Sequence, residues 1–131
     1  MKNPKEEAKR WFAQADFDLK EAETCLVRRS FAYACFFSEQ SAQKFIKGFL
    51  ILNGERFVPL HSIKELLEKA STYEKSLKKY IQEGQKLDRY YLITRYPDAL
   101  PTPSVPFESY GIIEAKEAVE IAQKIKKAIM M

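Results

Sequence analysis

Residues 31–52 read FAYACFFSEQSAQKFIKGFLIL and settle the class of fold. Their apolar residues recur at helical spacing and cover most of the circumference of a helix. A helix of this kind is central in a bundle or is shared with a second subunit. Asn53 and Gly54 follow, a pair that commonly ends a helix with a left-handed residue. The residues that gather on the apolar side are Phe31, Ala34, Cys35, Ser38, Ala42, Phe45, Ile46, Phe49 and Leu52.

Further helices flank this one on both sides. Asn3-Pro4 starts a helix that runs to about Val27, with apolar residues at alternating steps of three and four. After residue 61, Ser62 and Glu65 form a capping-box pattern that opens a short helix to about residue 70. Periodicity predicts two more helices, at about 73–93 and 109–129. We therefore expect an all-α, up-down bundle of four long helices and one short helix, in one domain over residues 1–131.

The segment between the last two helices is rich in proline. Residues 97–106 hold four of the six prolines in the chain, which excludes a helix or a central strand there. We expect a long extended connection, and long structured loops are often functional.

The composition of the chain argues against some classes of function. The 131 residues carry 22 Lys and Arg against 18 Asp and Glu, and each half of the chain has a net charge of +2. Because no basic face or tail stands out, we expect no binding to duplex DNA. No apolar run approaches 18 residues and residues 1–7 contain no signal core, so we expect a cytoplasmic protein that spans no membrane. Abundant Lys and Glu with few Asn and Gln hint at a thermophilic source.

The sequence lacks the residues that a metal site or a cofactor site requires. Cys25 and Cys35 have no CxxC spacing and the chain holds one histidine, so we expect no zinc site. Glycine-rich phosphate loops, HExxH and GxSxG are absent, and we expect no cofactor and no residue with a catalytic role. His61 precedes the capping box of the short helix, where a structural role is the simpler interpretation.

The strongest candidate for a binding site follows the helix predicted at 73–93. Asp88, Tyr91 and Arg95 share one helical face by spacing, and Tyr96 and Asp98 come next on the proline segment. An arginine fork suits phosphate, and a tyrosine ring can stack on a base. The alternative is that Arg95 pairs with Asp98 or Asp88 and only pins the segment to the bundle.

The polar side of the 31–52 helix is the second candidate. Gln40, Lys44 and Lys47 lie within about a third of a turn of one another. If this face meets Arg95, a basic pocket results. Otherwise it is a solvated face, which is the preferred interpretation for Lys47, or a dimer seam to which Phe36 and Ile51 contribute.

These features together resemble the HEPN family of small prokaryotic helical domains. The resemblance rests on the ACFFSEQSAQK and KGFL stretches of residues 34–50, on His61 with Ile63 and Leu66, and on Arg95-Tyr96-Pro97-Asp98. It spans the chain from about residue 11 to residue 129. The resemblance implies a bundle of four or five helices, frequent homodimers, and a minimal nucleotidyltransferase as a partner.

Some members of this family have been proposed to bind nucleotides, and many others are metal-independent ribonucleases and toxins. The ribonucleases carry an arginine followed by four to six residues and a histidine. Counted from Arg95, this histidine would fall at residues 100–102, which are Leu, Pro and Thr. Counted from Arg89, it would fall at residues 94–96, which are Thr, Arg and Tyr. Such chemistry needs a group that titrates near neutrality. The chain departs from the ribonuclease pattern here.

Three hypotheses follow. The first is a non-catalytic module that binds a nucleotide or phosphate group, or a short RNA, and partners a nucleotidyltransferase, within a toxin–antitoxin pair. Arg95 would hold phosphate, Tyr91 or Tyr96 would stack, Gln40 and Lys44 would donate, and Asp98 would position Arg95. The second is a ribonuclease with His61 or a tyrosine as its base. The third is a homodimeric scaffold without a small ligand.

Overall fold

The computed structural model describes residues 3–92 and 94–131, and all regular elements in these ranges are helices. The all-α prediction is therefore confirmed. The α-helices are α1 (Pro4–Val27), α2 (Phe31–Leu52), α3 (Ile63–Ala70), α4 (Ile81–Gly84) and α5 (Ile112–Ile129); the 3₁₀ helices are η1 (Lys75–Tyr80), η2 (Gln85–Tyr90), η3 (Pro97–Ala99) and η4 (Pro106–Glu108).

The helix ends form where capping chemistry predicts. The Asn3 side chain accepts hydrogen bonds from the first turn of α1, at 2.9 Å from the amide of Lys5. The hydroxyl of Ser62 accepts from the amide of Glu65 at 3.2 Å and caps α3. Gly54 has a φ of 107°, a conformation open to glycine, just after α2. The predicted bounds of the first two helices and of α3 are confirmed.

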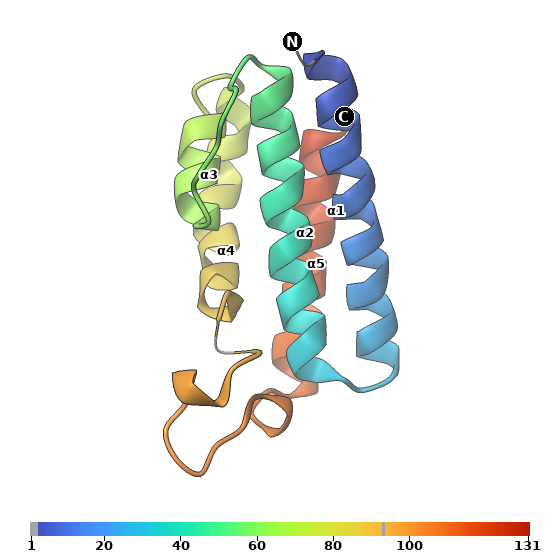
Figure 1. Ribbon diagram of the computed structural model, residues 1–131, viewed down its shortest axis with the longest axis vertical. Helices are drawn as coiled ribbons and strands as arrows, with labels where there is room; N and C mark the ends of the chain where they lie inside the picture. Colours follow the sequence, from blue (N-terminus) through green and yellow to red (C-terminus); the bar gives the residue numbers. More distant parts are fainter. Residues whose placement is uncertain (1–2, 93) are drawn as a thin grey trace.

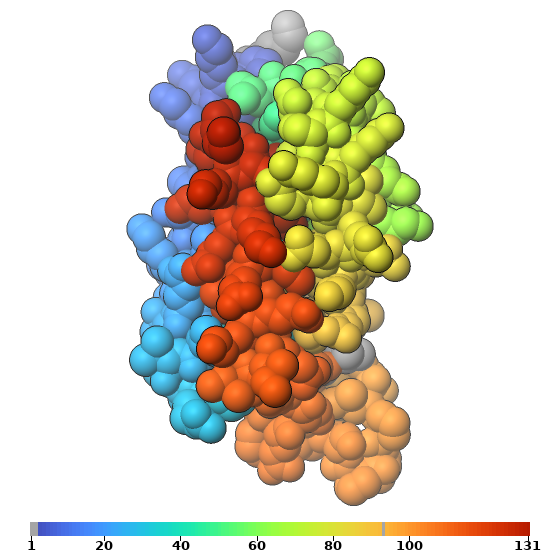
Figure 2. All heavy atoms as spheres, turned by 180° about the vertical axis from the view of Figure 1, so that it is seen from behind, coloured from blue at the N-terminus to red at the C-terminus, as the bar shows by residue number. Residues whose placement is uncertain are grey.

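Helix α2 lies at the centre of the bundle (Figure 1). Helices α1 and α5 pack on one side of it, while α3 and η2 pack on the other, and α4 and η1 pack on α3. Seen from behind, α5 lies between α1 and the segment around α4 (Figure 2). Helix α1 begins and α5 ends at the same end of the bundle, and the proline-rich segment lies at the opposite end (Figure 1).

Small residues let α1 and α2 approach closely. Ala8, Ala15 and Ala22 recur every seven residues on α1 and are buried. The hydroxyl of Ser41 donates to the carbonyl oxygen of Ala15 at 2.8 Å. A Cβ added at Gly48 would lie 2.6 Å from the Phe12 ring, so this contact requires glycine.

The helix predicted at 73–93 is wrong as a continuous α-helix. Residues 75–90 form η1, α4 and η2, in which 3₁₀ turns dominate, and Ile93 lies outside the described residues. Because a 3₁₀ helix repeats every three residues, Gly84, Leu87 and Tyr90 form its buried row. A Cβ on Gly84 would lie 2.7 Å from Leu67, so α3 packs directly on this backbone.

The proline segment is an irregular connection, as predicted, with two short exceptions. Pro97 and Pro106 each begin a single 3₁₀ turn, and proline suits a first turn because its missing N–H would have no partner there. The last helix begins at Ile112, three residues later than expected, with Gly111 as its N-cap. Its predicted stripe at Ala115, Ala118, Ala122, Ile125 and Ile129 is buried.

No helix within the described residues has both the length and the apolar character needed to cross a membrane.

Candidate binding site beside helix α2

Aromatic rings surround the guanidinium group of Arg95. Its central carbon lies 4.3 Å from the ring centroid of Phe36, 5.0 Å from that of Tyr96 and 6.0 Å from that of Tyr91. One Nη donates to the carbonyl oxygen of Tyr91 at 2.8 Å. The side chain is half buried, and its Nε has no hydrogen-bond partner among the described residues. The structure therefore brings together three of the predicted site residues, Tyr91, Arg95 and Tyr96, and adds Phe36 from α2.

The two acids expected near Arg95 do not pair with it. Within residues 3–92 and 94–131, no hydrogen bond or ion pair joins Arg95 to Asp98, which is exposed, or to Asp88. The carboxylate of Asp88 instead caps α3, where it accepts from the Ser62 hydroxyl at 3.0 Å and from the amide of Lys64 at 3.3 Å. Arg95 therefore does not form the ion pair with Asp88 or Asp98 that was the alternative for this segment.

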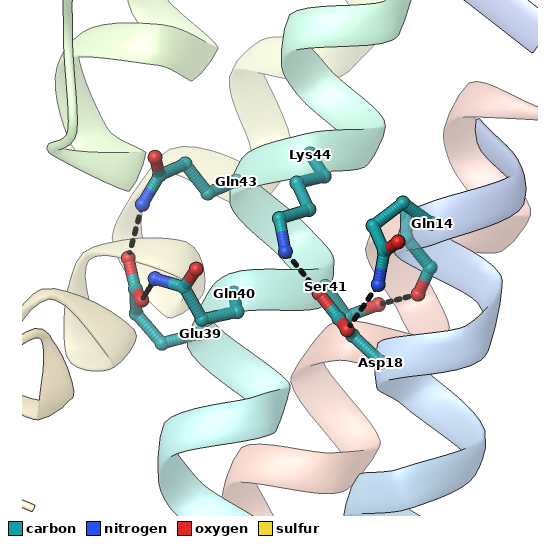
Figure 3. A network of polar contacts seen from close by, with 8 residues as sticks. Gln14, Asp18, Glu39, Gln40, Ser41, Gln43 and Lys44 are labelled. Atoms are coloured by element: carbon teal, nitrogen blue, oxygen red, sulfur yellow. Dashed lines mark hydrogen bonds and ion pairs between the residues drawn. The ribbon is translucent and has the colours of Figure 1, made fainter. Parts of the chain in front are cut away.

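A buried carboxylate lies on the side of α2 that faces α3 (Figure 3). Glu39 is 0% exposed and accepts hydrogen bonds from the side-chain amides of Gln40 and Gln43, each at 2.8 Å. Burial raises the pKa of Glu39 to about 7, although both amides favour its charged form. This carboxyl group therefore changes charge near neutral pH.

His61 lies between this network and the Arg95 cluster. Its Nδ1 is 3.5 Å from Oε1 of Gln43, and its ring centroid is 4.9 Å from that of Tyr91. Because Gln43 donates its amide N–H to Glu39, the Gln43 oxygen faces His61, and the contact is a hydrogen bond when Nδ1 carries the proton. His61 is exposed.

Lys44 lies on the other side of α2, toward α1 (Figure 3). Its ammonium contacts Oδ2 of Asp18 at 2.5 Å, and Gln14 donates to Oδ1 of Asp18 at 3.0 Å. Of the two predicted donors on α2, Gln40 thus contacts Glu39, whereas Lys44 is held by an acid on α1.

The prediction of a solvated Lys47 is wrong. The residue is 7% exposed, and its ammonium lies 5.8 Å from the centroid of the Trp11 ring. Burial lowers the pKa of Lys47. The polar side of α2 is covered by α1 and by the turn before α3, so Glu39, Gln43 and Lys47 are all buried.

This arrangement suits an anion attached to a flat ring. A guanidinium group without an acidic partner can hold phosphate, and half-exposed rings can stack on a base. Tyr96 is 51% exposed and offers such a ring beside Arg95. Among the described residues, no three His, Cys, Asp or Glu side chains gather closely enough to hold a metal ion.

Sequence reasoning missed Phe36 as the platform for Arg95, and it missed the burial of Glu39. Both had a signal. Phe36 precedes Gln40 by four residues and so shares its face, and Glu39 precedes Gln43 by four. Asp18 was missed as well, although it lies three residues after Ala15, beside the apolar stripe of α1, where an acid needs a partner.

Comparisons with known proteins agree with this architecture. A family model described as the HEPN domain matches residues 8–130. No curated protein matches the chain.

Solved structures that resemble the chain include TT1696 from Thermus thermophilus, with a TM-score of 0.86 and 33% identity over 94% of this chain and 95% of that one. ST0689, an archaeal HEPN homologue, has a TM-score of 0.76 and 31% identity over 99% and 97%. A HEPN domain protein from Thermotoga maritima, tm0613, has a TM-score of 0.71 and 27% identity over 92% and 94%. With the family model covering nearly its full length, the chain belongs to the HEPN domain family.

Proposed function

We propose that this chain is a non-catalytic HEPN module that binds a nucleotide or another phosphate-bearing group at the Arg95 cluster, and that it partners a minimal nucleotidyltransferase within a toxin–antitoxin pair. The cluster consists of Phe36, Tyr91, Arg95 and Tyr96. Phosphate binds the guanidinium group, and the base stacks on Tyr96.

One observation carries the nucleotide part of the proposal: Arg95 is half buried among aromatic rings and forms no ion pair or hydrogen bond with an acid within the described residues, and Glu39 acts on it only electrostatically. Burying a charge costs free energy unless another charge compensates it. Arg89 provides the contrast, because it also lies over a tyrosine ring, at 5.0 Å from Tyr90, but pairs with Glu117 at 3.6 Å. A ligand phosphate would give Arg95 the partner that Arg89 already has.

A thermal-shift screen against nucleoside mono-, di- and triphosphates tests this site. A ligand at one hundred times its Kd adds about 2.7 kcal/mol of stability, which raises the midpoint by several degrees. We expect a shift in the wild type that Arg95→Ala abolishes and that the matched Arg89→Ala retains. A shift of equal size in both variants would show that the site lies elsewhere.

The nucleotidyltransferase partner is proposed from the family resemblance and from the absence of a catalytic motif in the sequence. Co-expression with a nucleotidyltransferase encoded beside this chain tests it. We expect the two proteins to co-purify through size exclusion. Separate elution at micromolar concentrations of both would contradict the partnership.

A ribonuclease is the second candidate, because His61 and Arg95 flank the same ring. The His61 ring centroid lies 4.9 Å from that of Tyr91, and the Arg95 guanidinium carbon lies 6.0 Å from the same centroid, so both groups contact one tyrosine even though the family spacing is absent. A gel assay of RNA cleavage with EDTA decides between the two functions. Cleavage that His61→Ala or Arg95→Ala removes would replace the binding module with an enzyme.

We also propose that the chain forms a homodimer through the part of α2 that carries Phe36 and Ile51, both half buried. Light scattering at micromolar concentration tests this, and a mass of 15.3 kDa would contradict it.

A further inference from the structure

Three side chains connect the buried carboxylate of Glu39 to the surface at His61. Glu39 is 0% exposed and Gln43 is 6% exposed, whereas His61 is exposed. Gln43 donates its amide N–H to Oε2 of Glu39 at 2.8 Å, and its Oε1 lies 3.5 Å from Nδ1 of His61. The three side chains adjoin the Arg95 cluster, because the His61 ring packs on that of Tyr91 at 4.9 Å between centroids.

The Gln43 amide has a donor end and an acceptor end, and Glu39 determines which way round it lies. An ionised carboxylate only accepts hydrogen bonds, so it faces the amide nitrogen. In Figure 3 the nitrogen of Gln43 points toward Glu39 and the oxygen points away from it. Gln40 donates to the other carboxylate oxygen at 2.8 Å. Turning the Gln43 amide round would bring its oxygen against a carboxylate oxygen in a buried site, which is costly.

The charge of Glu39 depends on its surroundings. Burial raises its pKa to about 7, against the hydrogen bonds from the two amides. Asp88 of η2 also opposes the charged form, whereas Arg95 favours it, and Lys47 on the same helix interacts with it electrostatically. At pH 8.5 the carboxyl group is therefore ionised and acts only as an acceptor.

The orientation of the Gln43 amide determines in turn where His61 carries its proton. A neutral imidazole has one N–H, on either of its two nitrogens. The Gln43 oxygen receives a hydrogen bond only when this proton is on Nδ1. Nε2 is then an unprotonated nitrogen on an exposed ring, and no hydrogen bond within the described residues occupies it.

We propose that Glu39 and Gln43 are positioning residues that keep the proton of His61 on Nδ1, so that Nε2 accepts a hydrogen bond from a hydroxyl or amino group of the bound ligand. A histidine side chain free in water prefers the proton on Nε2, which would present a donor at this surface instead. The ligand part of the inference rests on the function proposed above, since a nucleotide carries ribose hydroxyls beside its phosphate. It adds to that function a donor group that the ligand must have.

His61 is the only histidine in the chain, so its ring nitrogens can be observed without ambiguity. The ¹⁵N-labelled protein is studied at pH 8.5 by long-range ¹H–¹⁵N correlation, in which a protonated and an unprotonated ring nitrogen differ in chemical shift. We expect Nδ1 to be the protonated nitrogen in the wild type. Finding the proton on Nε2 would overturn the proposal, whether or not any variant folds.

Variants show whether the effect passes through Gln43. Gln43→Leu removes the hydrogen bond to His61, and we expect the ratio of the two tautomers to shift about fivefold toward the Nε2–H form. Glu39→Met should shift the ratio in the same direction. Gln40→Leu is the matched control, because Gln40 donates to the same carboxylate at the same distance, and this variant should keep the wild-type ratio. An unchanged ratio in Gln43→Leu or Glu39→Met, or an equal shift in Gln40→Leu, would contradict the positioning role.

The same signals test the ligand part. The wild type is titrated with AMP and with ATP, and we expect the Nε2 signal to move saturably toward the shift of a protonated nitrogen. An Nε2 signal that stays in place while either nucleotide raises the thermal midpoint would overturn the ligand part and leave the Arg95 site intact. A midpoint that neither nucleotide raises would contradict the ligand part together with the proposed nucleotide site, and the tautomer of His61 would still decide the role of Glu39 and Gln43.

Discussion

The contact of α2 with α1 and the Arg95 cluster hold their polar groups in different ways. Against α1, the carbonyl of Ala15 receives the Ser41 hydroxyl, and Asp18 receives Lys44 and Gln14. Against the segment after α4, Arg95 has aromatic neighbours and forms no ion pair or hydrogen bond with an acid among the described residues.

We therefore expect one of these contacts to determine the stability of the fold and the other to determine ligand binding. Removing one member of a buried polar pair leaves the other without a partner and destabilises the fold, whereas a charge that forms no such pair can gain one from a ligand. The α1–α2 contact should therefore govern the free energy of unfolding, and the Arg95 cluster should govern affinity.

The largest expected effect is on the α1–α2 flank. Phe45 is 1% exposed and stacks on Phe12 at 6.3 Å between ring centroids, so Phe45→Ala should cost about 3–5 kcal/mol through lost burial and a cavity. Urea unfolding followed by circular dichroism measures it. A cost under about 1 kcal/mol would mean that this flank does not hold the fold.

The contribution of Glu39 to the free energy of unfolding should depend on pH. Its pKa in the folded state is raised to about 7 by burial, while the unfolded value is 4.5. The folded state therefore holds the proton more tightly, so this contribution to stability is complete below pH 4.5 and is lost as pH rises toward 7. The loss amounts to about 3 kcal/mol.

The measurement compares unfolding free energies of the wild type and Glu39→Gln from pH 4 to pH 8. Because glutamine does not titrate here, the difference between the two proteins should change by this amount in favour of the variant as pH rises. Parallel curves would show that Glu39 stays ionised in the folded state.

The third effect concerns the close approach of α1 and α2. Gly48→Ala would place its Cβ 2.6 Å from the Phe12 ring, and the resulting shift should cost about 1–3 kcal/mol. Gly111→Ala is the matched control, because a Cβ there has no atom within 4 Å. Equal midpoints for the two variants in a thermal melt would contradict the tight packing.

The smallest expected effect on stability is at the Arg95 cluster. Arg95→Ala removes a half-buried cation–π contact and one hydrogen bond, and should cost about 1 kcal/mol in the absence of ligand. We expect this variant to melt near the wild type but to lose the nucleotide-dependent shift. A loss as large as that of Phe45→Ala would make Arg95 a structural residue.

The sequence predicted the regular parts of the fold because they follow one period. The α1 and α2 bounds and the α5 stripe depend on caps and on a 3.6-residue repeat, and both are local. The prediction of one α-helix at 73–93 was wrong because 3₁₀ helices flank the short α4, and no local sequence pattern reveals this change of helix type.

Only the part of the candidate site that is local in the sequence could be predicted. Tyr91, Arg95 and Tyr96 are neighbours along the chain, so their proximity needed no knowledge of packing. Phe36 reaches Arg95 from α2, and Lys44 turns toward Asp18 on α1, and such contacts depend on how the helices are arranged.

The most direct test of the Arg95 site observes its guanidinium group itself. In ¹⁵N-correlated NMR spectra, the Nε–H signals of Arg95 and Arg89 are assigned by comparison with Arg95→Ala and Arg89→Ala, and the wild type is titrated with a nucleotide selected in the thermal screen. We expect the Arg95 signal to move saturably while the Arg89 signal stays in place. An Arg95 signal that does not move while the nucleotide still stabilises the protein would contradict the assignment of the site.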